Sequence, residues 1–150
     1  MELRGRLSAG LKDAMRERDA VRLSTLRLIN AALKDQDIAL RAEGREVGDA
    51  EATAILSKMV RQRQESASAY EEGGRLELAE KERAEIAVIE GFLPRKLSEA
   101  ETDAAIDAAI AQTSATSLRD MGRVMGVLKA RHAGQLDFRE AGATVKARLG

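Results

Sequence analysis

Residues 92–101 read Phe92-Leu93-Pro94-Arg95-Lys96-Leu97-Ser98-Glu99-Ala100-Glu101, and this stretch divides the chain. Pro94 is the only proline among 150 residues, and it biases Leu93 away from helical backbone angles. Ser98, followed three residues later by Glu101, has the pattern of a capping box, which marks the start of a helix. We therefore predict a boundary here, between an N-terminal domain at residues 1–93 and a C-terminal domain at residues 94–150.

Upstream of this boundary, apolar residues recur at the spacing of α-helices. Leucines and a methionine every four residues predict a first helix over about residues 2–17. Asp19 is a suitable N-cap for a second helix that ends near Gly44. Apolar residues of this second helix cover too wide an arc for one partner, so we expect it to pack on two sides. They are Val21, Leu23, Leu26, Leu28, Ile29 and Leu33.

Five further helices are predicted. Asp49 is the expected N-cap of a third helix, which Gly73-Gly74 separates from a fourth. Capping patterns beyond the boundary predict three short helices, over about residues 98–112, 117–132 and 137–149. The predicted fold class is therefore all-α, with an N-terminal four-helix unit followed by a small three-helix tail unit.

Composition agrees with a helical fold and restricts the classes of function. Only 2% of the residues are aromatic, which is unsuitable for β-sandwiches or barrels. The 25 basic and 25 acidic residues balance, so any basic site must be local. Without cysteine the chain has no disulfides and no thiolate sites. No secretory leader or membrane-spanning run is apparent, so we predict a cytoplasmic protein without a membrane partner.

The sequence offers few residues for catalysis or metal binding. His132 is the only histidine, and its place at the end of an apolar stripe indicates packing or compensation of a helix dipole. Glu80, Glu82 and Glu85 alternate with basic residues and are interpreted as a solvated helix face or as partners of ion pairs with the third helix. No phosphate-binding loop is present. We therefore predict no catalytic residue, no metal and no cofactor.

Arg63 lies on the apolar stripe of the third helix, apart from the polar residues around it. One interpretation is a structural ion pair with a carboxylate of the fourth helix, for which Glu82 and Glu85 are the candidates. The other is an exposed site for an anion.

The stretch Met121-Gly122-Arg123-Val124-Met125-Gly126 is the most informative about function. Two glycines inside a helix cost about 1 kcal/mol each relative to alanine, so something is expected to approach this backbone closely. At about 100° per residue, the glycines share an arc of roughly 120° with three basic residues. Such a surface suits a phosphate backbone, unless the glycines only admit a neighbouring helix. The candidate RNA-binding residues are Arg119, Gly122, Arg123, Gly126, Lys129 and Lys146.

Two blocks of sequence resemble a known family. The run from Met121 to Gly126, together with the ending Val145-Lys146-Ala147-Arg148-Leu149, resembles the tail domain shared by the YqeY family and the B subunit of the tRNA-dependent amidotransferase. The block Arg61-Gln62-Arg63-Gln64-Glu65-Ser66 and Leu93-Pro94 are similar to the N-terminal half of YqeY proteins. In the amidotransferase subunit the tail is associated with tRNA recognition. The resemblance therefore implies tRNA or another structured RNA as the partner.

Three hypotheses about function follow. The first is a non-catalytic accessory protein that binds tRNA or other RNA through the tail. The second is a component of a glutamine-dependent carbon–nitrogen ligase, which the resemblance implies although the large catalytic portion of the amidotransferase subunit is absent. The third is a helical adaptor whose glycine face docks a protein partner.

Overall fold

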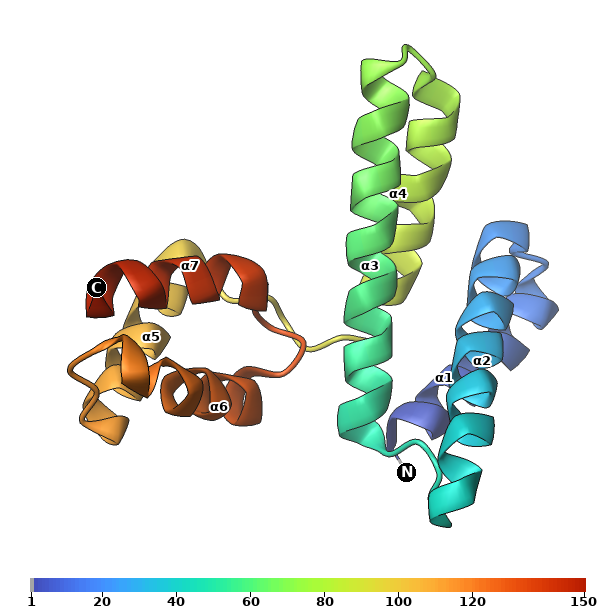
Figure 1. Ribbon diagram of the computed structural model, residues 1–150. Helices are drawn as coiled ribbons and strands as arrows, with labels where there is room; N and C mark the ends of the chain where they lie inside the picture. The colour runs from blue at the N-terminus through green and yellow to red at the C-terminus, as the bar shows by residue number, and fades with distance from the viewer. Residues whose placement is uncertain (1) are drawn as a thin grey trace. The chain divides into compact units, whose positions relative to one another are not determined.

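The computed structural model describes residues 2–150 and confirms the all-α fold class (Figure 1). Within these residues there are seven α-helices, two short 3-10 helices and no strand. Contacts divide the chain into unit 1, which ends at Pro94, and unit 2, Arg95–Gly150. The elements are α1 (Glu2–Glu17), α2 (Ala20–Leu40), η1 (Arg41–Glu43), α3 (Asp49–Glu72), α4 (Leu76–Glu90), α5 (Glu99–Thr113), η2 (Leu118–Asp120), α6 (Met121–His132) and α7 (Phe138–Leu149).

Unit 1 consists of two helix pairs around one apolar core. The α3–α4 pair forms a long hairpin, which Gly74 allows to reverse because its φ of 74° is in the left-handed region. Asp19 caps α2 as predicted, with its carboxylate accepting from the Arg22 backbone N–H at 3.1 Å. The largest fully buried apolar side chains of this core are Leu7, Leu26, Ile29, Leu33, Leu56 and Ile89.

The two ends of unit 1 are joined by α1. Arg6 donates to the carbonyl oxygens of Gly91, at 3.2 Å, and Phe92, at 3.5 Å, and its guanidinium lies 5.6 Å from the centre of the Phe92 ring. The ring itself lies against Gly10, where a Cβ atom would be 2.8 Å from Phe92 Cζ. A side chain at position 10 would therefore displace this ring.

The predicted N-cap of α3 is wrong. Gly48 occupies the cap position, and Asp49 is the first helical residue. The Asp49 carboxylate instead accepts from the Leu3 backbone N–H at 3.3 Å, so it connects α3 to α1. A long-range partner has replaced the local one that the sequence pattern suggests.

Asp37 is a second carboxylate that fixes the chain around α2. It accepts from Arg4 Nη1 at 3.0 Å and from the Val47 backbone N–H at 2.8 Å. The Arg4 side chain and then the Val47 N–H lower the pKa of Asp37 below its usual value, because both stabilise the ionised carboxylate.

Unit 2 packs α5, α6 and α7 around a smaller core of Ile106, Ala109, Val124, Leu128, Ala141 and Val145. Ser98 and Glu101 form the predicted capping box at the start of α5. Arg95 donates to both oxygens of Glu101 at 2.8 Å. This guanidinium, together with the Ser98 backbone N–H, lowers the pKa of Glu101 from 4.5 to about 2.

The start of α6 differs from the prediction. The helix begins at Met121 rather than near residue 117, because Ser117 and Asp120 form a capping box around the 3-10 turn η2. Asp120 Oδ2 accepts from the backbone N–H groups of Thr116, at 2.9 Å, and Ser117, at 3.3 Å. The capping pattern correctly indicates a helix start at Ser117, but the helix that begins there is a 3-10 helix and not an α-helix.

Candidate nucleic-acid interface

The side of α6 away from the unit 2 core is uncovered. Val124 and Leu128 face the core, and the opposite side of the helix is exposed along its length. We call this exposed side the glycine face. It consists of Gly122, Arg123, Gly126 and Lys129.

The other two candidate RNA-binding residues lie outside α6. Arg119 is exposed in η2, so the α-helical angle from which it was predicted to share the arc does not apply to it. Lys146 is exposed on α7 and shares no helical face with the others. The structure therefore places four of the six predicted residues on one helix face.

The two α6 glycines have no neighbour inside the protein. No heavy atom beyond the helix's own backbone lies within 4 Å of a Cβ built at Gly122 or Gly126. At Gly142 of α7, in contrast, a Cβ would meet the methyl carbons of Met121 and Met125 at 3.7 and 3.8 Å. The close approach expected at Gly122 and Gly126 is thus not made within the described chain, and an explanation must come from outside it.

Arg123 is a constrained cation. Its Nη1 donates to the Thr113 carbonyl oxygen at 3.1 Å and its Nη2 to Asp120 Oδ1 at 2.5 Å. The Thr116 backbone N–H and then the Arg123 guanidinium lower the pKa of Asp120. Arg123 therefore closes the turn before α6, and part of its charge is already balanced. Arg119 and Lys129 form no ion pair with another residue in the range 2–150.

Arg63, on α3, makes an ion pair with a carboxylate of α4. Its Nε donates to Glu85 Oε2 at 2.9 Å, and the two side chains are only 15% and 12% exposed. Nη1 donates to the Met59 carbonyl oxygen at 3.3 Å. Glu82, the other candidate, does not take part in this pair. The guanidinium is thus occupied by internal partners.

His132 has a local structural role. Its Nδ1 lies 3.2 Å from Gln135 Oε1, and Gln135 Nε2 donates to the Arg95 carbonyl oxygen at 3.0 Å. These contacts connect the end of α6 to the segment before α5. Among residues 2–150, no group of three or more His, Asp or Glu side chains has the arrangement of a metal site.

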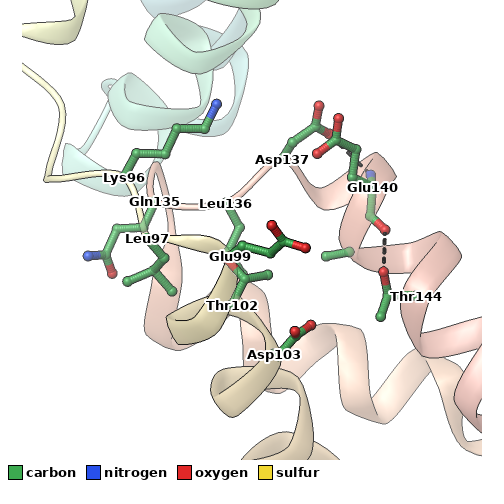
Figure 2. A pocket seen from close by; sticks show the side chains of 11 residues that line it. Lys96, Leu97, Glu99, Thr102, Asp103, Gln135, Leu136, Asp137, Glu140 and Thr144 are labelled. Carbon is green, nitrogen blue, oxygen red and sulfur yellow. Dashed lines mark hydrogen bonds between the residues drawn. The ribbon is translucent and has the colours of Figure 1, made fainter.

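A pocket of about 420 Å³ opens between the starts of α5 and α7 (Figure 2). Four carboxylates line it, from Glu99, Asp103, Asp137 and Glu140. Asp103 accepts from Arg148 at 3.2 Å, and Asp137 caps α7 by accepting from the Arg139 backbone N–H at 2.9 Å. This pocket could not be predicted from the sequence, because no motif links the two helix starts. Its negative charge disfavours phosphate, so the candidate interface with RNA is the glycine face instead.

No helix in the described range 2–150 has both the length and the apolar character needed to cross a bilayer.

Two curated relatives match part of the chain. The altered inheritance of mitochondria protein 41 of Lachancea thermotolerans is 31% identical over 102 residues, which is 67% of this chain and 54% of the relative. The protein of the same name from Meyerozyma guilliermondii is 37% identical over 87 residues, covering 58% of this chain and 44% of the relative. The matched regions therefore span about half the length of these relatives.

Both relatives are named as mitochondrial proteins, which contradicts the predicted cytoplasmic location. Location depends on address signals that receptors read, and neither cysteine content nor the lack of long apolar runs measures such signals.

The family model for Yqey-like proteins matches residues 4–149, which is almost the whole sequence. This match includes both the block around Arg63 and the glycine face, and it confirms the resemblance to the YqeY family. The chain belongs to the YqeY family.

Proposed function

We propose that this protein is a non-catalytic accessory factor that binds tRNA or another structured RNA through the phosphate backbone. The contact surface is the glycine face together with Arg119. In this proposal the three-helix tail makes the RNA contacts, and the four-helix unit does not take part in them.

The observation that carries the proposal is the open space over Gly122 and Gly126. Each glycine costs about 1 kcal/mol relative to alanine inside a helix, and no internal contact compensates for that cost. A ligand backbone that lies directly on the helix would explain why glycine stands at these positions, since a Cβ atom would keep the ligand away from the helix.

Charge supports a phosphate ligand. Between Ser117 and Gly150 there are seven Lys or Arg residues against three acidic ones, although the whole chain is neutral. Lys129 is exposed beside the glycines, and Arg119 is exposed in the preceding turn. With three aromatic residues in the chain, stacking of bases on an aromatic platform is a poor alternative to contacts with phosphates.

The amidotransferase tail adds a second, independent line of support, because that related domain is associated with tRNA recognition. A role as a component of a glutamine-dependent carbon–nitrogen ligase would require a separate glutaminase and an ATP-using partner. It would be recognised by amide formation on tRNA only when all components are mixed.

The test is titration of a purified tRNA pool at several salt concentrations. For wild type, the logarithm of the affinity should fall linearly with the logarithm of the salt concentration, because binding releases counterions. Lys129→Ala should reduce that slope by about 0.7–0.9 and weaken different RNA sequences alike. Gly126→Leu should weaken binding at every salt concentration with the slope largely retained.

The structure selects the variants. Lys129→Ala is preferred to Arg123→Ala, because Arg123 also holds Asp120 and Thr113 in place. Arg131→Ala is the matched control, since Arg131 is exposed on α6 but turned about 160° from the centre of the glycine face. Absence of wild-type binding at low salt, or equal affinity of all folded variants, would reject RNA and favour the protein-adaptor hypothesis.

A further inference from the structure

The outer side of α2 exposes apolar residues that no part of unit 1 covers. Val21, Leu28 and Ile38 are 44%, 47% and 52% exposed. These are three of the seven large apolar side chains that are exposed in residues 2–150, so exposure concentrates on this one helix. The sequence predicted that α2 packs on two sides. In the structure α2 packs against α1, α3 and α4 through the side that carries Leu26, Ile29 and Leu33, whereas the side that carries the exposed residues has no partner in unit 1.

The exposed residues follow the seven-residue repeat of a helix–helix seam. With Val21 at position a, the a positions hold Val21, Leu28 and Asp35, and the d positions hold Ser24, Ala31 and Ile38. Ser24 and Ala31 are small, and this lets another helix approach between the larger side chains. We call these six residues the α2 seam.

A basic edge runs along the α2 seam. Arg27 and Lys34 occupy successive g positions, and Arg41 continues the row into η1. Arg27 and Lys34 are exposed, and neither forms an ion pair with another residue in the range 2–150. In paired helices, residues at g lie beside the partner's flanking positions and determine which partner is accepted.

The charges argue against a second copy of this chain as the partner. Antiparallel pairing of two α2 helices places g against g, which brings the basic rows together. Parallel pairing places a against a, which brings two Asp35 carboxylates together between the helices, near the C-terminal end of the seam. Asp35 within the apolar row is equally unfavourable for insertion into a lipid surface.

We propose that the α2 seam docks an amphipathic helix of a different protein, with apolar residues opposite Val21, Leu28 and Ile38, a polar residue opposite Asp35, and carboxylates along the edge that meets Arg27 and Lys34. This surface lies on unit 1, and the proposal is independent of RNA binding by the glycine face. It assigns a role to the second apolar side of α2, which the core of unit 1 leaves unused.

The probe is a monomeric stapled peptide of three heptads, with Leu at a and d except for one Asn opposite Asp35, and with Glu at e and g. Its matched control carries Lys in place of Glu. Binding to the full-length protein is measured by fluorescence anisotropy. The Glu peptide should bind, and the Lys peptide should bind at least about tenfold more weakly. The Arg27→Glu, Lys34→Glu double variant should reverse this preference.

Leu28→Ser should weaken the Glu peptide about tenfold, whereas Leu76→Ser, at the similarly exposed start of α4, should not. Both positions are exposed, so the variants should melt like wild type. Gly126→Leu should leave peptide binding unchanged, which separates this result from the RNA test. Equal binding of both peptides would overturn the proposal. The proposal would also be overturned if the wild-type protein formed a dimer that Leu28→Ser abolishes, or bound phosphatidylserine vesicles in a way that Leu28→Ser abolishes.

Discussion

Replacing Gly10 by alanine is expected to destabilise unit 1 relative to the same replacement at Gly5. Both glycines lie inside α1, so both variants gain about 0.5–1 kcal/mol of helix stability. At Gly5 there is nothing within 4 Å of the new Cβ. At Gly10 the Cβ would lie 2.8 Å from Phe92 Cζ and 3.5 Å from an Arg22 nitrogen. The ring has little freedom to move, because Phe92 is buried and Arg6 lies over it.

The magnitude follows from comparing the two variants. The gain in helix propensity is common to both and cancels, which leaves the overpacking penalty of about 1–3 kcal/mol at Gly10. Urea unfolding followed by the fluorescence of Tyr70 measures this difference in unit 1, because Tyr70 is the only tyrosine and the chain has no tryptophan. Phe92→Leu removes the outer ring atoms and should relieve most of the penalty in the double variant.

Equal stability of Gly10→Ala and Gly5→Ala would refute this reasoning, since it would mean that the ring does not rest on the α1 backbone. A penalty that Phe92→Leu fails to relieve would place the conflict elsewhere, with Arg22 as the next candidate.

Three further outcomes are expected. Glu85→Ala should destabilise unit 1 by about 1–3 kcal/mol in the same urea assay, because it leaves the largely buried Arg63 guanidinium without its carboxylate, whereas Glu82→Ala should change little. The pKa of Glu101 is lowered in the folded state, so its contribution to stability is complete above pH 4.5 and lost as the pH falls toward 2. Thermal melts of wild type and Glu101→Gln should therefore converge over this range. Brief digestion with trypsin should first cut after Arg95, which is exposed where the two units meet in sequence.

The sequence was most informative about helix ends where the partner is local. Asp19, Ser98 and Asp137 cap helices as predicted, because a capping bond joins groups only two or three residues apart. The predicted N-cap role of Asp49 is wrong because its partner is distant in the sequence. Its carboxylate binds the N–H of Leu3, 46 residues away, and no local pattern contains that information.

The candidate site was predictable in part. Helical periodicity correctly placed four residues on one side of α6, but it also included Arg119, which lies in a 3-10 turn with a different rotation per residue. The free-energy cost of glycine in a helix indicates that another group lies close to the glycine, but it does not show whether that group belongs to this chain or to a ligand. Gly10 and Gly126 look alike in sequence, and only the fold separates the glycine under Phe92 from the one that faces open space.

The bond from Arg6 to the end of α4 has a consequence for the order of events during synthesis. Arg6 and the carbonyl groups that it binds are 85 and 86 residues apart, so α1 is made long before these partners. At roughly 5–20 residues per second, the ribosome needs about 4–17 seconds to supply them. During that interval the bare backbone at Gly10 has no ring to cover it. The contacts of α1 with Asp37 and Asp49 can form earlier, but its contact with the end of α4 must wait until Phe92 has emerged.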